Sequence, residues 1–357
     1  MAFSLFKKKK EKKDNDRYHV LHVNDVVNVA KDAVNLVFKK PENFNYQPGQ
    51  FITIIKEVNG KKIRRAYSLC TTPFEDENPA VTVKRVDGGA MSNDLNDHVR
   101  VGDEIEIMEP MGVFTTEYHA SKKRKVVFFG GGSGITPLMS ILRTILLKEP
   151  ESEVVLVYGN RSEEYIIFKD LIGLLEEKYN GRFKAIHILE EGDAPYQGRP
   201  TKKMIKEICA EVAVDNETEC YICGPKPMMD LLSEVLPETG IDEKNIRMES
   251  FEAGKTSPLE VIDAKNTESK VTIVLDGEEF EITTKKNASI LESALANDLD
   301  MPYSCQSGLC TACRGKCLEG QISTDEAEGL SPDELDEGYV LTCVGKPLSD
   351  RIKLEMG

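Results

Sequence analysis

The stretch S-C-Q-S-G-L-C-T-A-C-R-G-K-C, residues 304–317, gathers four cysteines near the C-terminus. Three of them, Cys305, Cys310 and Cys313, have the spacing C-x4-C-x2-C. A further cysteine, Cys343, follows in the segment Y-V-L-T-C-V-G. The residues between the first three cysteines are mostly small, so backbone N–H groups of a tight loop can approach the sulfur atoms. These four cysteines therefore form a candidate metal site.

Their spacing indicates which metal group the site holds. Thiolates are the soft ligands that iron–sulfur irons prefer, and C-x4-C-x2-C with a distant fourth cysteine is the spacing of a 2Fe-2S site. Four thiolates also bind zinc, but zinc sites more often use two paired knuckles, so zinc is the alternative. Cys317 is expected to be no ligand but a small buried residue on the outgoing strand R-G-K-C-L.

Composition limits the class of protein. The chain has 357 residues, long enough for two or three domains, and a net charge of -15 that argues against nucleic-acid binding. It contains no apolar run of about 18 residues, so no transmembrane segment is expected. The nine unevenly spaced cysteines do not suggest a disulfide framework, which favours a reducing, cytoplasmic setting. The lysine-rich start, residues 1–16, is predicted to be a disordered arm, with weak peripheral membrane contact as the alternative.

The pattern of apolar residues predicts three folded domains. Residues 17–121 contain short β-rich runs, such as Q-F-I-T-I-I-K-E-V, which predict an antiparallel β-barrel. Strands alternate with helices over residues 122–252, which predicts an α/β domain with a parallel sheet. Residues 253–268 read as a linker with few large apolar side chains. Residues 269–357 open with a hairpin at Asp276-Gly277 and form the domain that contains the cysteine cluster.

Two motifs in the barrel segment suit a flavin nucleotide. R-A-Y-S, Arg65 to Ser68, presents an arginine, an aromatic ring and a hydroxyl, which can meet a phosphate, a ring face and a ring-edge nitrogen. Alone, the tetrapeptide is a weak signal and could be an ordinary strand. Further on, Gly89 to Ser92 form a G-x-x-S turn whose backbone N–H groups can bind a pyrophosphate at the start of a helix.

Two motifs in the α/β segment suit a nicotinamide nucleotide. V-V-F-F-G-G-G-S-G-I-T-P predicts a strand, a glycine loop and a helix opened by Pro137, an arrangement that favours phosphate groups. Y-I-C-G-P places Cys223 at the C-terminal end of a later strand, although a buried structural cysteine is the alternative there. Arg161 follows another strand and favours NADPH over NADH, because an arginine accommodates a 2′-phosphate.

The ordered set R-x-Y-S, G-x-x-S, G-x-G-x-x-P and C-G-P resembles the ferredoxin-NADP reductase family over residues 16–252. P-Y-S-C-Q-S-G-L-C-T-A-C and G-Y-V-L-T-C resemble plant-type ferredoxins, which implies a β-grasp fold. The whole chain resembles the reductase components of bacterial oxygenases, such as those of phenylacetyl-CoA epoxidase and ketosteroid hydroxylases. The phthalate dioxygenase reductase type has the same domain order but carries FMN, so FMN stays an alternative to FAD.

The resemblance implies roles for individual residues. Ser68 would lie near the flavin N5 and Cys223 beside the nicotinamide, which makes them the expected catalytic residues. Phe251 would cover the flavin, with a plain core phenylalanine as the alternative. The residues expected to bind the flavin and nicotinamide nucleotides are Arg65, Ala66, Tyr67, Ser68, Val83, Lys84, Gly89, Ala90, Met91, Ser92, Gly131, Gly132, Ser133, Gly134, Thr136, Pro137, Arg161, Cys223, Gly224, Pro225 and Phe251.

These motifs together predict an electron-transfer enzyme. Hydride would pass from NADPH, or NADH, to FAD, and single electrons would pass through the 2Fe-2S cluster to an oxygenase or hydroxylase. A general reductase for soluble carriers and a non-enzymatic redox sensor are the alternatives. From residue 269 onward the chain has 17 acidic and 8 basic residues. The densest acidic run, residues 325–337, is either a solvated face or a surface that steers a basic partner.

Overall fold

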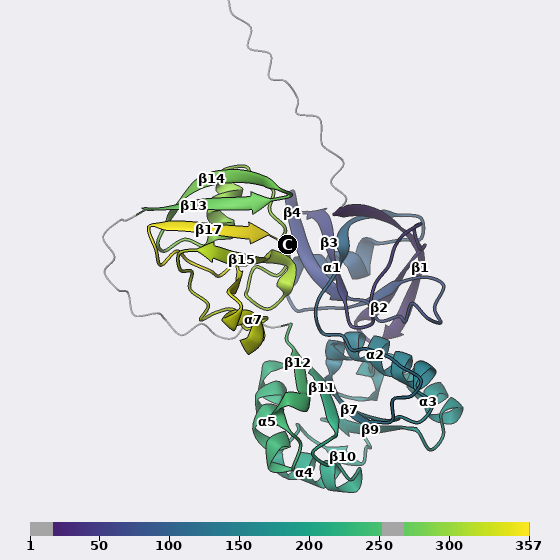
Figure 1. Ribbon diagram of the computed structural model, residues 1–357. Coiled ribbons are helices and arrows are strands. Elements are labelled where there is room, and N and C mark those ends of the chain that lie inside the picture. The colour runs from purple at the N-terminus through teal and green to yellow at the C-terminus, as the bar shows by residue number, and fades with distance from the viewer. Residues whose placement is uncertain (1–16, 252–267, 357) are drawn as a thin grey trace, which may run out of the picture.

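The computed structural model describes residues 17–251 and 268–356, which form three sheets, one after another along the chain (Figure 1). The lysine-rich arm and nearly all of the expected linker lie outside the described residues. In Figure 1 the first and third sheets lie beside each other, and the second lies below them. The expected three-domain architecture is confirmed, while the domain boundaries stay a prediction.

The first sheet has six antiparallel strands in the order β4-β3-β6-β1-β2-β5. A bridge between Leu69, directly after β4, and Val81 in β5 joins its two edges. The predicted antiparallel barrel is therefore confirmed. The helix α1 packs Met91 and Leu95 into the barrel core. The elements are β1 (Tyr18–Ala30), β2 (Ala33–Phe38), β3 (Phe51–Val58), β4 (Lys61–Ser68), β5 (Ala80–Lys84), α1 (Ala90–His98) and β6 (Glu104–Met111).

The second sheet is parallel, with the order β10-β9-β8-β7-β11-β12. Alternate residues of β7 face opposite sides, so Phe128 packs with helices α2 and α3, and Phe129 with α4 and α5. The strands are β7 (Lys125–Gly131), β8 (Glu153–Asn160), β9 (Phe183–Leu189), β10 (Tyr196–Gln197), β11 (Glu219–Cys223) and β12 (Ile246–Glu249). The helices are α2 (Ile135–Lys148), α3 (Lys169–Lys178), α4 (Lys202–Glu211) and α5 (Lys226–Glu238), with 3-10 turns η1 (Gly132–Gly134), η2 (Glu163–Tyr165) and η3 (Glu243–Asn245).

The third sheet has the order β14-β13-β17-β15-β16, with β13 and β17 parallel at its centre. Helix α6 packs Ile290 and Ala294 against it, which completes the expected β-grasp fold. The β13–β14 hairpin turns at Asp276 and Gly277, whose φ angles of 54° and 77° fit a tight hairpin turn. The elements are β13 (Glu268–Leu275), β14 (Glu278–Lys285), α6 (Ile290–Ala296), η4 (Thr311–Cys313), β15 (Arg314–Glu319), α7 (Pro332–Asp336), β16 (Tyr339–Leu341) and β17 (Arg351–Met356).

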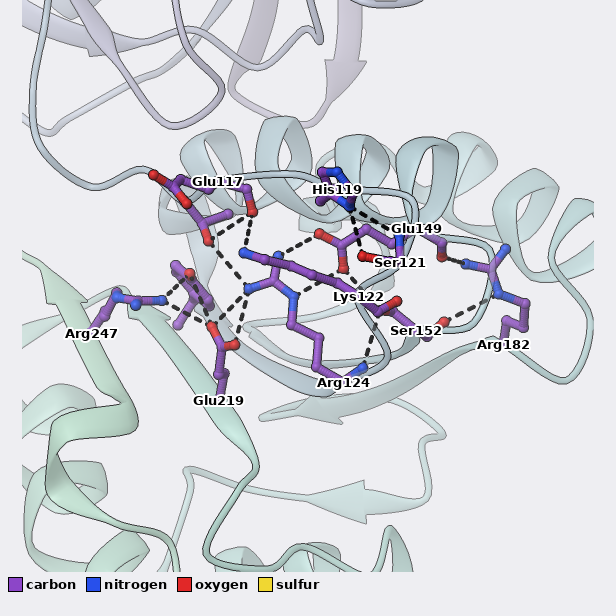
Figure 2. A network of polar contacts seen from close by, with 12 residues as sticks. Glu117, His119, Ser121, Lys122, Arg124, Glu149, Ser152, Arg182, Glu219 and Arg247 are labelled. Atoms are coloured by element: carbon purple, nitrogen blue, oxygen red, sulfur yellow. Dashed lines mark hydrogen bonds and ion pairs between the residues drawn. The ribbon is translucent and has the colours of Figure 1, made fainter.

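A buried charge network fixes the chain where it passes from the barrel into the second sheet. Figure 2 shows Arg124 between the carboxylates of Glu149 and Glu219, with N–O distances of 2.8 and 2.9 Å. Arg124 also donates to the hydroxyl of Thr116 at 3.2 Å, in the segment that leaves the barrel. Glu149 is completely buried and also accepts a hydrogen bond from Ser152. Since a buried charge without a partner is costly, this network sets the path of the connection.

Candidate active site

All three domains contribute to one cavity of about 480 Å³. The barrel provides Phe51, Arg65, Ala66, Tyr67, Ser68, Thr82, Lys84, Val86, Gly89, Ala90, Met91 and Ser92. The second domain provides Ser133, Thr136, Glu249, Ser250 and Phe251, and the cysteine loop provides Cys305, Ser307, Leu309 and Cys310. Segments that are far apart in the sequence therefore meet at a single site.

The barrel side of the cavity fits a flavin nucleotide. The R-A-Y-S segment ends strand β4, and burial raises the pKa of Tyr67, which keeps its phenol neutral. Gly89 is the N-cap of α1 and no side chain caps this helix end, so its first N–H groups are available to an anion. A Cβ at Gly89 would lie 2.5 Å from the hydroxyl oxygen of Ser92 and 3.0 Å from the carbonyl oxygen of Val86, so a larger residue there would crowd the turn. This is the cradle that a pyrophosphate requires.

The glycine loop of the second domain packs directly against the C-G-P segment. A Cβ at Gly134 would lie 2.0 Å from the carbonyl oxygen of Cys223, and one at Gly131 would lie 2.5 Å from Cδ of Pro225. Both positions therefore require glycine for the two loops to touch. The helix α2 begins at Ile135, two residues before the expected start, and Pro137 lies in its first turn.

Glu249 is a site residue that the sequence patterns did not reveal. It ends strand β12, in register with Cys223 on β11, and lines the cavity. Its Oε2 is buried without a hydrogen-bond partner, and burial raises the pKa of this carboxyl to about 8. The acidic residue in M-E-S-F, at the end of the last strand and two positions before Phe251, was the signal that could have found it.

Some of the expected nucleotide-binding residues do not line the main cavity. Cys223 is fully buried beneath the glycine loop, where burial and the carboxyl of Glu249 raise its pKa, and Val83 is fully buried in the barrel. Phe251 is 44% exposed at the rim, so the alternative of a plain core phenylalanine is wrong. The roles assigned to individual residues stay predictions. The expected residues outside the main cavity are Val83, Gly131, Gly132, Gly134, Pro137, Arg161, Cys223, Gly224 and Pro225.

The four proposed ligands come together although Cys343 is distant in the sequence. The thiol of Cys310 lies 3.2 Å from that of Cys305, and Cys343 contacts both Cys305 and Cys313. Backbone N–H groups of Ser307 and Cys310 point at the sulfur of Cys305, each at 3.4 Å. Within the described ranges, no group of three or more His, Cys, Asp or Glu side chains is placed to hold a single metal ion.

Cys317 is separate from this group. It lies on the outgoing strand β15, as expected, and its thiol points to the carbonyl oxygens of Glu319 and Gly320 at 3.5 and 3.7 Å. The residue packs against the apolar core of this domain but is only partly buried, so the expectation of a core contact holds while that of a buried position was wrong. The strand ends near the sheet surface here, where the next residues, Leu318 and Glu319, are exposed.

A second cavity, of about 330 Å³, lies between the barrel and the second domain. Arg161 and Lys84 both line it, and both lie near the ring of Tyr165, at 5.0 and 5.9 Å from its centroid. Burial and the nearby Arg161 lower the pKa of Lys84. Among the residues that the structure describes, no carboxylate forms an ion pair with either cation. The lining residues are Asp32, Lys84, Arg85, Val86, Asp87, Asn93, Arg161 and Tyr165.

A flavin-type barrel, a nucleotide-type α/β domain and a cysteine loop around one cavity define a flavin- and nicotinamide-dependent iron–sulfur oxidoreductase. Family models bear this out along the chain. The oxidoreductase FAD-binding domain matches residues 20–116, the oxidoreductase NAD-binding domain residues 128–234, and the 2Fe-2S iron–sulfur cluster binding domain residues 273–348. The predicted cofactors FAD, NAD(P)H and a 2Fe-2S cluster are therefore confirmed.

The full length of the chain also matches known proteins. It is 35% identical to the ferredoxin reductase component of 3-ketosteroid-9-alpha-monooxygenase from Rhodococcus rhodochrous, over 94% of this chain and 96% of the relative. It is 32% identical to a component of 1,2-phenylacetyl-CoA epoxidase from Escherichia coli, over 95% of this chain and 97% of that relative. Phthalate dioxygenase reductase has the same architecture, with a TM-score of 0.61 and 25% identity over 96% of this chain and 98% of that one. The chain belongs to the family of oxygenase reductase components.

Proposed function

We propose that this protein oxidises NADPH and delivers the electrons singly to an oxygenase or hydroxylase. The observation that carries the proposal is the shared cavity, where the R-A-Y-S strand, the nucleotide domain and the Cys305–Cys310 loop meet. Bound FAD supplies the conversion between hydride and single electrons, and a bound 2Fe-2S cluster accepts one electron at a time. The protein positions these groups and excludes water.

Individual residues serve that arrangement. The guanidinium of Arg65 and the free N–H groups at the start of α1 are suited to the flavin phosphates. The hydroxyl of Ser68, which is 4% exposed, suits a hydrogen bond to the flavin ring edge. The neutral carboxyl of Glu249 can hold or give a proton at Oε2 in the same cavity. Cys223 is fully buried and packs beneath the glycine loop, on the nicotinamide side of the site.

NADPH is favoured over NADH by the second cavity. Arg161 and Lys84 face it without an ion-pair partner in the described part of the chain, so a phosphate would compensate two charges. Lys84 also reaches the glycine loop, because its Nζ lies 3.0 Å from where a Cβ of Gly132 would be. An arginine beside a tyrosine ring suits the 2′-phosphate and the adenine of NADPH.

An oxygenase partner is supported by the relatives, which are named as components of a monooxygenase and of an epoxidase. The acidic run at residues 325–337 favours a basic docking surface on that partner, although Glu328 and Glu334 already pair with Lys226 and Arg314. All nine cysteines lie in the described residues and none of them forms a disulfide, which is compatible with the cytoplasm. No helix in the described ranges is long and apolar enough to cross a membrane.

An anaerobic titration tests the proposal. Adding NADPH to the purified holoprotein should bleach the flavin and iron–sulfur absorbance bands, and NADH should do so only at higher concentration. In Arg161→Ala the KM for NADPH should rise roughly tenfold or more while that for NADH changes little, because one charge-assisted phosphate contact is lost. If neither nucleotide reduced the protein, the proposed function would be wrong. Reduction of soluble carriers as fast as of a candidate oxygenase would favour a general reductase.

A further inference from the structure

One side chain of the barrel extends into the iron–sulfur domain. Arg64 lies on strand β4, directly before Arg65, and successive strand residues point to opposite faces. Arg65 lines the flavin cavity, whereas Arg64 donates to the carboxylate of Asp300 at 3.1 Å. Figure 1 shows β4 next to the third sheet. Adjacent residues of one strand thus serve the flavin site and the domain contact.

Aromatic rings enclose Arg64 on both sides of the domain boundary. Its guanidinium carbon lies 4.3 Å from the ring centroid of Tyr303, in the iron–sulfur domain, and 5.6 Å from that of Tyr18, in the barrel. Tyr18 also donates its hydroxyl hydrogen to Asp300 at 3.2 Å. The cation–π contact of Arg64 with Tyr303 and the two hydrogen bonds to Asp300 therefore join the two domains.

Burial distinguishes this contact from the other ion pairs that reach the iron–sulfur domain. The side chain of Arg64 is only 7% exposed, compared with 19% for Arg17, which pairs with Asp276, and 39% for Lys226, which pairs with Glu328. The carboxylate of Asp300 is 61% exposed, so the ion pair by itself contributes little free energy. The stronger part of the contact is the buried guanidinium of Arg64 packed against the ring of Tyr303.

The contact also fixes the position of the cysteine loop. Tyr303 precedes Cys305 by two positions in the sequence, and Cys305 and Cys310 line the cavity that the R-A-Y-S strand also lines. We propose that Arg64 is a positioning residue that docks the iron–sulfur domain so that the Cys305–Cys310 side of the cluster faces the flavin. This inference rests on the proposed function. Electron transfer slows steeply with distance, so undocking should slow this step alone.

The step concerned is the passage of one electron from two-electron-reduced flavin to the cluster, in which one iron goes from ferric to ferrous. A second electron follows after the cluster has passed the first to an acceptor, such as cytochrome c in an assay. Arg64 takes no part in the preceding hydride transfer, because it does not line either cavity. A loss of docking should therefore slow electron transfer to the cluster without slowing hydride transfer to the flavin.

The test compares Arg64→Met with the wild-type holoprotein in anaerobic stopped-flow experiments with NADPH. Flavin bleaching should keep its wild-type rate, while reduction of the cluster should slow roughly tenfold or more, because the docked arrangement loses both the ring contact with Tyr303 and the ion pair with Asp300. Small-angle scattering should show a larger radius of gyration for the variant, a readout that does not depend on activity. Lys62→Ala is the matched control. Lys62 is an exposed cation on the same strand, and its ion-pair partner, Glu106, belongs to the barrel and not to the iron–sulfur domain.

Asp300→Asn tests the same contact from the side of the iron–sulfur domain. Asp300 is 61% exposed, and its replacement leaves the barrel intact. The double variant should slow cluster reduction less than the product of the single effects, because both side chains act in one contact. Wild-type cluster reduction and an unchanged radius of gyration in both single variants would overturn the docking role. If NADPH failed to reduce wild-type protein, the proposed function itself would fail, which is a different result.

Discussion

Replacing Glu249 by Gln should remove a pH dependence of stability from the nucleotide domain. The buried Oε2 raises the pKa of this carboxyl from 4.5 to about 8, so the folded protein holds a proton that the unfolded chain releases. The folded state is therefore favoured most below pH 4.5, and this contribution is lost as the pH rises from about 4.5 to about 8. Glutamine is neutral throughout and should show no such loss.

The size of the effect follows from the shift. A rise in the pKa of Glu249 from 4.5 to about 8 corresponds to a change of at most about 5 kcal/mol in the free energy of unfolding. The residue as a whole is only partly buried, at the wall of the cavity, so solvent reduces the cost of its charge. We expect about 2 kcal/mol in practice. Relative to wild type, Glu249→Gln should therefore gain about 2 kcal/mol between pH 5 and pH 9.

Hydrogen exchange measured by mass spectrometry reports this local stability in the holoprotein. Peptides that cover β11 and β12 give the opening free energy at each pH after correction for intrinsic exchange rates. Glu243→Gln serves as the control, because Glu243 is an exposed carboxylate in the turn before β12. Parallel pH profiles for wild type and Glu249→Gln would show that the carboxyl is not protonated in the folded protein and refute the reasoning.

Three further changes test the site and the fold. Cys343→Ala should abolish the iron–sulfur absorbance and the bound iron. Cys317→Ala should leave both intact, because the thiol of Cys317 points to carbonyl oxygens. Equal iron loss in the two variants would contradict the proposed ligand set. Arg124→Met should lower the free energy of unfolding by about 3 to 5 kcal/mol in denaturant titrations, since it leaves the buried carboxylate of Glu149 without its partner. Gly134→Ala should weaken nucleotide binding, measured as a higher KM, because the added methyl group would clash with the backbone at Cys223. An unchanged KM would count against close packing between the glycine loop and the C-G-P segment.

Local patterns in the sequence predicted the barrel, the parallel sheet and the iron–sulfur site, whereas the β-grasp fold and the choice of FAD came from the family resemblance. Alternating apolar residues specify barrel strands, and alternation of strands with helices specifies a parallel sheet, because both depend on short-range periodicity. The C-x4-C-x2-C spacing is local as well, and Cys343 was joined to it as the distant fourth cysteine of that pattern. The prediction for Cys317 was wrong because burial of one strand residue depends on how far the sheet extends, which spacing does not specify.

What the sequence by itself determined was the identity of the three domains and of their cofactors, while the residues that it assigns to each cofactor stay predictions. Only the tertiary structure decided how the modules meet: that Glu249 has a buried carboxyl oxygen beside Cys223, that Lys84 and Arg161 share a cavity, and that Arg64 reaches Asp300. The physical reason is that such contacts join side chains from separate strands and domains. Their burial and charge interactions arise only when those surfaces are brought together, so no local pattern encodes them.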